Sequence, residues 1–284
     1  MNVSSHAFPV LKVNIAGAEN SADDLAVEEP LEIRLSFLTE SGLPVIQPLS
    51  ITMRTPAPGQ DMELAAGFLL TEGIIQKKED IQELLQVDEH IVLIQLTDSV
   101  IPDIHRLERH FYTSSSCGVC GKTSVDAVKT ICPVFTSPGF LSVSLQVIYQ
   151  LPHRIREMQN TFAATGGLHA AALFDGNGKL LLAREDVGRH NAVDKLIGAA
   201  LLMNMLPLQQ HILLLSGRAS FELIQKATMA GLCFVCAIGA PSSLAVQLAA
   251  ERQMTLIGFL RNERFNVYCG ENRVLVEQYA ANFY

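Results

Sequence analysis

A loop with two closely spaced cysteines is the first place in this 284-residue sequence where chemistry is expected. Cys117 and Cys120 are separated by Gly118 and Val119 and followed by Gly121, and three serines precede them. No apolar period runs through this stretch, so we expect a loop. The glycines beside the thiols give such a loop the conformational freedom that a shuttling atom would require.

Three kinds of chemistry compete for this Cys-x-x-Cys loop. A dithiol oxidoreductase needs the pair to open a helix after a strand, and serines precede it instead. A structural zinc site needs a second pair of ligands. The third kind is a nucleophilic thiolate that receives a sulfur atom and passes it on. The spacing alone leaves the choice between them open.

The remaining cysteines do not complete a zinc site. Cys233 and Cys236 lie in an apolar, strand-like run, and side chains three apart on a strand point to opposite faces. We expect them to be small buried side chains in the core. Cys132 and Cys269 have no partner at metal-binding spacing. We therefore predict no structural metal.

The densest polar cluster is Glu185–Lys195, where a strand is expected to pass into a helix. Gly188 permits close backbone approach, and Arg189 and His190 offer donors at the positive end of the helix dipole. That combination suits an anion, particularly phosphate. A plain solvated helix end is the alternative.

A second turn of this kind is Ser216-Gly217-Arg218-Ala219-Ser220, which follows an apolar strand and precedes a helix. Gly217 allows a tight turn, Ser220 can cap the helix, and Arg218 adds a forked donor for phosphate. Residues 240–243 repeat the pattern at the next strand. One such turn is an ordinary helix cap, but three at strand carboxyl ends indicate a site for a nucleotide-like ligand.

The elements that must position these turns alternate between strands and helices in the second half of the chain. Strands are predicted over 31–37, 44–54, 90–96, 168–174, 179–183, 211–215, 233–238 and 255–260. Helices are predicted over 61–70, with Asp61 as N-cap, over 142–159, broken or kinked by Pro152, and over 191–204, 220–230 and 242–253. The pattern predicts an α/β fold, α+β overall, with a parallel or mixed sheet.

Four regions follow from this pattern. We expect a flexible arm over 1–28, a smaller N-terminal α+β domain over 29–112, a mobile cysteine-containing loop and linker over 113–140, and a ligand-binding domain over 141–284.

Composition limits the classes of function. The chain has 21 Lys and Arg against 29 Asp and Glu, a formal charge of −8, which argues against a general nucleic-acid binder. Its hydrophobic share of 49% is enough for a sizeable core. No secretory signal and no apolar run of membrane-spanning length is visible, so we expect a cytoplasmic protein without membrane contact.

Taken together, the motifs resemble the FdhD/NarQ family, the formate dehydrogenase accessory sulfurtransferases. The likeness runs from about residue 28 to the end, and the combination of motifs is highly specific. The motifs are Cys117–Gly121, Glu185–His190 with Ala192, Asp194 and Lys195, Arg218–Glu222 with Lys226, and Leu256–Phe259 with Arg264, Val267 and Tyr268.

The resemblance implies a sulfur relay. Such proteins accept sulfur from a cysteine desulfurase as a cysteine persulfide, which maps to Cys117, while Cys120 assists or shields it. They pass the sulfur to the molybdenum or tungsten bis(molybdopterin guanine dinucleotide) cofactor that formate dehydrogenase needs. The family segment that holds this cofactor maps to Phe259, Leu260, Arg261, Asn262, Glu263 and Arg264.

The family fold is cytidine-deaminase-like in its larger, C-terminal domain, a three-layer αβα arrangement with a mixed sheet. Gly166–Ala171 agrees with it, because this segment resembles the helix opening of zinc deaminases. Ala171 stands where the deaminase glutamate would be, so deaminase chemistry is missing. Family members also dimerise, and a homodimer is therefore expected.

Two other functions remain open at this level. In one, the protein is a non-catalytic chaperone that holds the cofactor for formate dehydrogenase, and Cys117→Ala would leave activity intact. In the other, it is a dithiol oxidoreductase that cycles Cys117 and Cys120 through a disulfide.

Overall fold

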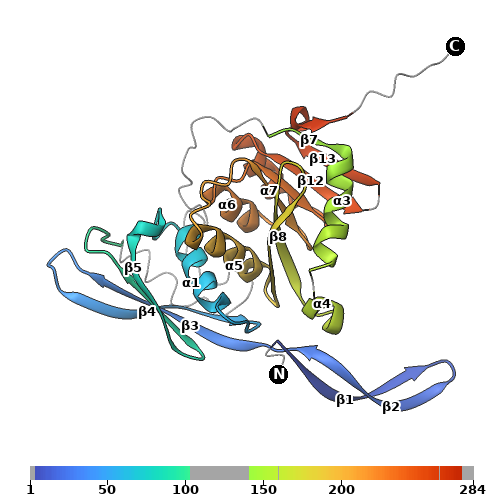
Figure 1. The fold of residues 1–284 in the computed structure, drawn as a ribbon, viewed down its shortest axis with the longest axis horizontal. Coiled ribbons are helices and arrows are strands. Elements are labelled where there is room, and N and C mark those ends of the chain that lie inside the picture. The colour runs from blue at the N-terminus through green and yellow to red at the C-terminus, as the bar shows by residue number, and fades with distance from the viewer. Residues whose placement is uncertain (1–3, 103–140, 159, 262, 277–284) are drawn as a thin grey trace. The chain divides into compact units, whose positions relative to one another are not determined.

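The computed structural model describes residues 4–102, 141–158, 160–261 and 263–276 (Figure 1). The chain forms two compact units that interleave along the sequence. The first unit comprises residues 1–132, 159–171 and 184–206, and the second comprises 133–158, 172–183 and 207–284. The predicted domains 29–112 and 141–284 differ from this division, because two segments from the second half of the chain belong to the first unit.

A four-stranded sheet forms the base of the first unit. Its strands are β3 (Glu29–Leu38), β4 (Pro44–Arg54), β5 (Ile81–Asp88) and β6 (Ile91–Leu96), in the order β4-β3-β6-β5. The predicted strands at β3, β4 and β6 are confirmed. β5 was not predicted, because its polar and apolar residues do not alternate and most of its side chains are exposed.

Two helices of the first unit pack with their backbones in close approach. They are α1 (Gln60–Thr71) and α5 (Arg189–Leu202) (Figure 1). A Cβ atom added at Gly67 would lie 1.9 Å from the carbonyl oxygen of Asp194, and one at Gly198 would lie 1.8 Å from that of Glu63. Only glycine fits at these crossing points, and this packing explains why α5 belongs to the first unit rather than to the predicted C-terminal domain.

The start of α1 differs from the prediction. The N-cap is Gly59, with φ at 75°, and Asp61 lies inside the first turn. The Asp61 carboxylate accepts two hydrogen bonds from Arg54, from Nε at 2.9 Å and from Nη2 at 3.0 Å. Asp61 is therefore an ion-pair partner rather than a cap.

Most of the predicted N-terminal arm is a β-hairpin. β1 (Ser5–Asn14) and β2 (Gly17–Ala26) pair antiparallel along their whole length. The hairpin was not predicted because most of its side chains are exposed on both faces, so burial imposes no alternation on the sequence. The short helix α4 (Asn160–Thr165) follows in the same unit.

A six-stranded mixed sheet forms the centre of the second unit. Its order is β13-β12-β11-β10-β8-β9. The strands are β8 (His169–Asp175), β9 (Leu180–Asp186), β10 (His211–Leu215), β11 (Phe234–Ala237), β12 (Thr255–Arg261) and β13 (Arg264–Cys269). β10, β11 and β12 are parallel, and β13 is antiparallel to β12. The predicted α/β class with a mixed sheet is confirmed, whereas β13 was not predicted.

Helices cover both faces of this sheet (Figure 1). α6 (Phe221–Met229) and α7 (Ser243–Glu251) lie on one face, and α3 (Leu145–Arg156) lies on the other. Of the predicted break or kink at Pro152, the break is wrong, since α3 continues through Pro152 to Arg156, and the kink stays a prediction. Proline fits the helical φ angle, but it removes one backbone donor and its ring crowds the carbonyl four residues earlier.

Short elements complete the described chain. They are β7 (Val143–Ser144), β14 (Val274–Leu275) and the 3-10 turns at Lys78–Asp80 and Glu271–Arg273. None of the helices in the described part of the chain combines the length and apolar character needed to span a bilayer.

Candidate functional site

In the second unit, the turns that follow β10 and β11 meet the irregular middle of β12, where its pairing with β13 shifts register. Parallel strands bring their carboxyl ends to one edge of a sheet. The Gly239 N–H donates to the Gly217 carbonyl at 2.9 Å, and the Ala219 N–H donates to the Ala240 carbonyl at 3.1 Å. The Phe259 N–H donates to the Gly239 carbonyl at 3.0 Å. We call residues 216–220, 239–243 and 258–259 the sheet-edge platform.

Two glycines allow these turns to touch. A Cβ atom at Gly239 would lie 3.0 Å from the backbone of Gly217 and Arg218. A Cβ atom at Gly258 would lie 2.7 Å from the Pro241 ring and 2.9 Å from Tyr268. Larger residues at either position would push the turns apart, so the platform depends on both glycines.

The two helices that start at the platform differ in how they are capped. The Ser242 hydroxyl accepts a hydrogen bond from the Ala245 N–H at 3.2 Å and so caps α7. Ser220 occupies the N-cap position of α6, but its side chain makes no cap hydrogen bond. Its buried Oγ has no hydrogen-bond partner among the described residues. The start of α6 therefore keeps donor capacity, and the exposed Arg218 precedes it.

The turn between β12 and β13 adds positive charge to the second unit. Arg261 and Arg264 are cross-strand partners, and both are exposed. Glu263 is exposed in the same turn with φ at 57°, and Asn262 lies outside the described residues. Two guanidinium groups at adjacent positions suit a polyphosphate.

Two neighbouring residues of the predicted cofactor segment, Phe259 and Leu260, differ in exposure. Phe259 is 41% exposed and has a φ of 53°, in the left-handed region that non-glycine residues rarely adopt. Leu260 is fully buried, so its side chain supports the strand. An exposed aromatic ring held in this conformation can stack against a planar ligand.

Gly188, Arg189 and His190 lie in the first unit, at the start of α5. At this predicted phosphate site, the Asp186 carboxylate already accepts one of the backbone donors. Asp186 accepts the Gly188 N–H at 2.8 Å and pairs with Lys195 at 2.6 Å, and both charged side chains are fully buried. His190 is also buried, whereas Arg189 is half-buried. The Gly188 N–H is therefore bonded to a carboxylate of the chain itself, while phosphate binding by Arg189 and His190 stays a prediction.

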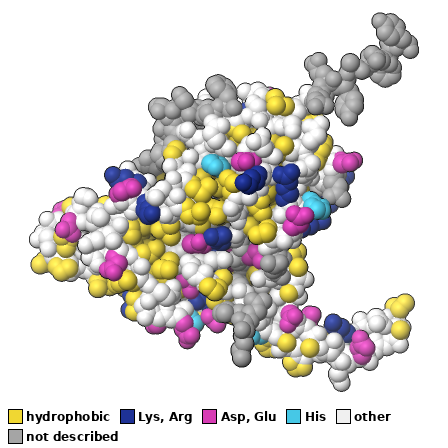
Figure 2. Space-filling view, viewed as in Figure 1, with side chains coloured by type: hydrophobic (Ala, Val, Ile, Leu, Met, Phe, Trp, Pro, Cys, Tyr) yellow, Lys and Arg dark blue, Asp and Glu magenta, His cyan; other side chains and the backbone are white. Residues whose placement is uncertain are grey.

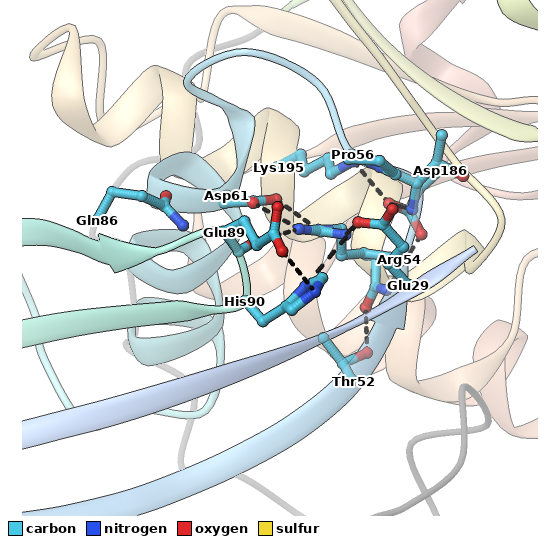
Figure 3. Close-up of polar contacts among 12 residues, drawn as sticks. Glu29, Thr52, Arg54, Pro56, Asp61, Gln86, Glu89, His90, Asp186 and Lys195 are labelled. Atoms are coloured by element: carbon cyan, nitrogen blue, oxygen red, sulfur yellow. Dashed lines mark hydrogen bonds and ion pairs between the residues drawn. The ribbon is translucent and has the colours of Figure 1, made fainter. Parts of the chain in front are cut away.

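Lys195 connects this helix start to the end of β4 (Figure 3). Its ammonium donates to the Thr55 carbonyl at 2.8 Å, while the Thr55 N–H donates to Asp186 at 3.1 Å. Asn191 adds bonds from its amide to the Met53 carbonyl and to Asp186. The network fixes the segment after β4 against α5.

Arg54 is the centre of a second charged cluster in the first unit (Figure 3). Only 1% of its side chain is exposed, and it pairs with both Asp61 and Glu29 at 2.9 Å. Burial lowers the pKa of Arg54, but the hydrogen bonds that it donates to these carboxylates, together with their negative charge, outweigh burial and leave the pKa raised. Sequence reasoning missed this residue. The sequence feature that could have indicated Arg54 is its place as a charged residue at the last position of the predicted strand 44–54.

The predicted catalytic residues Cys117 and Cys120 lie outside the described residues, as does Cys132. Cys233 and Cys236 are buried, and burial raises the pKa of both thiols. Cys269 is half-buried, and burial raises its pKa as well. These three thiols are therefore poor nucleophiles. Within the described ranges, no three His, Cys, Asp or Glu side chains gather as metal ligands would.

The fold places the chain in a class: two-unit α/β proteins in which turns from neighbouring strands meet at one edge of a mixed sheet. The sequence model of the FdhD/NarQ family matches residues 26–275, and the chain belongs to this family. A Streptomyces coelicolor relative named sulfur carrier protein FdhD is 49% identical, over 93% of this chain and 94% of its own. A relative of the same name from Saccharolobus solfataricus is 38% identical, over 96% of this chain and all of its own.

A solved structure shares the fold. The crystal structure of a proposed formate dehydrogenase accessory protein from Desulfotalea psychrophila superimposes with a TM-score of 0.74 at 23% identity. The match covers 95% of this chain and 99% of that one.

Proposed function

We propose that this protein is a sulfur carrier that accepts sulfur from a cysteine desulfurase on Cys117 and delivers it to the bis(molybdopterin guanine dinucleotide) cofactor of formate dehydrogenase. The names of the relatives that match almost the whole chain support the carrier role. The observation that carries the cofactor role is the sheet-edge platform, where Ser220 and Arg218 leave donors at the start of α6.

The first chemical step moves one sulfur atom between two thiols. The Cys117 thiolate attacks the terminal sulfur of the desulfurase persulfide. A new S–S bond forms on Cys117, the old one breaks, and the desulfurase cysteine leaves as a thiolate. This exchange needs no outside oxidant or reductant, because one persulfide replaces another.

In the second step the cofactor is the substrate. The terminal sulfur leaves Cys117 for the metal centre, which supplies the two electrons that convert it to a sulfido ligand. Cys117 returns to the thiolate. Cys120 assists this step or shields the persulfide. We also propose that the protein acts in the cytoplasm as a homodimer.

The chain's own residues would hold the two ends of the cofactor. Arg218, Arg261 and Arg264 would bind its phosphates as forked donors. The exposed ring of Phe259 would stack on a guanine base. Because the Gly188 N–H already bonds to the buried Asp186, we assign no phosphate to Gly188.

The test is intact mass after incubation with a cysteine desulfurase and cysteine. The wild type gains one sulfur atom, about 32 Da, as a persulfide does. Cys117→Ala abolishes the gain, whereas Cys269→Ala keeps it, because its thiol is half-buried with a raised pKa. No gain in the wild type would contradict the relay and leave a cofactor-holding chaperone. A dithiol oxidoreductase would instead lose 2 hydrogens, roughly 2 Da, as Cys117 and Cys120 form a disulfide.

A further inference from the structure

The four-stranded sheet of the first unit has one packed face and one open face. Leu31, Ile33 and Leu35 of β3 are at most 1% exposed on the packed face. The residues of β3 that lie between these three project to the open face. The open face carries Ile46 and Ile51 of β4, which are 62% and 54% exposed.

A row of four side chains crosses the open face at one end. Glu32 of β3 is the cross-strand partner of Ile51 on one side and of Ile91 on the other. Ile91 is in turn the partner of Asp88 on β5. Cross-strand partners project to the same face, so isoleucine and carboxylate alternate across all four strands.

This row lies in a groove of about 630 Å³. The lining residues are Pro30, Glu32, Ile51, Asp88, Glu89, His90 and Ile91. Three of them are carboxylates, and no Lys or Arg is among these described lining residues. His90 lies between one of these carboxylates and one outside the lining, with Nε2 3.6 Å from Glu89 and Nδ1 3.9 Å from Glu29 (Figure 3).

The nearest arginines already have carboxylate partners. Arg34 donates from Nε and Nη2 to both oxygens of Glu32, at 2.9 and 3.1 Å. Arg54 is held by Asp61 and Glu29. Asp88 accepts the backbone N–H of His90 at 2.7 Å, and Glu89 is 86% exposed. The groove therefore presents negative charge beside an apolar floor.

We propose that this groove docks a segment of a partner protein that presents lysine or arginine side chains next to apolar ones. The apolar stems would cover Ile51 and Ile91, and the cationic heads would reach Asp88 and Glu89. Figure 2 shows hydrophobic and acidic side chains next to each other over β3, β4 and β5. The inference concerns a protein–protein contact and does not depend on the sulfur relay.

Charge argues against a second copy as the occupant. The chain carries −8 overall. Its most exposed apolar segment, the β1–β2 hairpin, brings Lys12 but also Glu19, Asp23 and Asp24, a net charge of −2. A like-charged segment would meet repulsion in this groove, whereas a basic one would be attracted.

The experiment measures fluorescence anisotropy with a labelled peptide of leucine and lysine, at about 0.15 M salt. We expect Asp88→Asn with Glu89→Gln to weaken binding about tenfold, and Ile51→Ser to weaken it similarly. Glu40→Gln with Asp98→Asn removes the same charge from exposed turns outside the groove, and Ile15→Ser removes an exposed isoleucine from the hairpin. These two controls should bind like the wild type.

Several results would overturn the proposal. Equal weakening in the charge control would mean that overall acidity attracts the peptide. Equal binding of a leucine–glutamate peptide would mean that charge plays no part. Self-association of the wild type that Ile51→Ser abolishes would assign the groove to a second copy. All variants lie at exposed positions, and unchanged circular dichroism confirms that they fold.

Discussion

Charged side chains are used differently in the two units. In the first unit, Arg54, Asp186 and Lys195 are buried, and each is bonded to an opposite charge. In the second unit, Arg218 and Arg264 project from turns at the edge of the sheet. Buried pairs hold backbone segments in place, whereas exposed guanidinium groups remain available to a ligand. This contrast separates the charged residues that hold backbone segments of the fold in place from those that we propose to bind the substrate.

The largest expected effect is the loss of Lys195. Lys195→Met would leave the buried Asp186 without its cation and lower the free energy of unfolding by about 3–5 kcal/mol. Chemical denaturation measures this loss, and Lys12→Met in the exposed hairpin is the control. Adding Asp186→Asn should recover much of the stability. If the double variant were as unstable as the single one, the pair would not act as a unit.

The exposed arginines should behave in the opposite way. GDP serves as a probe for the guanine nucleotide part of the proposed cofactor. Arg218→Ala and Arg264→Ala each remove a forked donor, so we expect about tenfold weaker binding of GDP and an unchanged free energy of unfolding. Isothermal titration calorimetry gives the affinity. Arg252→Ala, at the far end of α7 from the platform, should keep wild-type affinity. Equal losses in all three variants would argue that GDP binds by general charge attraction.

Two serines of the platform, Ser220 and Ser242, allow a structural role and a proposed binding role to be compared within the second unit. Ser242→Ala removes the cap of α7 and should cost about 1 kcal/mol of stability. Ser220→Ala removes a hydroxyl that makes no cap bond, so it should leave stability nearly unchanged but weaken GDP binding. Thermal unfolding and titration of both variants separate the two roles. Equal stability losses would show that Ser220 is an ordinary cap.

The smallest effect concerns Glu185 in the first unit. Burial raises its pKa, although bonds from the Phe162 and Thr161 N–H groups lower it in part. A raised carboxyl pKa means that the folded state binds more protons than the unfolded state. The contribution of Glu185 to stability is therefore fully present below the pKa of this carboxyl in the unfolded state. It is lost as pH rises through the pKa in the folded state. Glu185→Gln should flatten this fall in pH-dependent unfolding curves, and an unchanged slope would contradict it.

The sequence predicted the elements that have one buried face. β3 alternates apolar and polar residues, and β10 matches its predicted span of 211–215. The β1–β2 hairpin was missed, because side chains exposed on both faces leave no period in the sequence. β13 was also missed, although exposed and half-buried residues alternate along its six positions. Pro152 does not break α3, since the packing of a helix can outweigh the loss of one hydrogen bond.

The sequence predicted only those parts of the candidate site that are formed by residues close together along the chain. The turns at 216–220 and 240–243 were expected from glycine and serine after apolar strands, and the structure brings them together. The bonds of Thr55 to Asp186 and Lys195 join residues more than 130 positions apart. No local pattern encodes such a contact, so the bonds of Asp186 and Lys195 to the segment after β4 became visible only in the folded chain.

The most direct test follows radioactive sulfur through both steps. The protein is loaded by a cysteine desulfurase with radiolabelled cysteine, separated from the donor, and mixed with bis(molybdopterin guanine dinucleotide) cofactor. Our proposal predicts that the label moves from the protein to the cofactor, that Cys117→Ala carries none, and that Arg218→Ala loads normally but transfers slowly. Label that stays on the loaded wild type after the cofactor is added would contradict the proposed transfer.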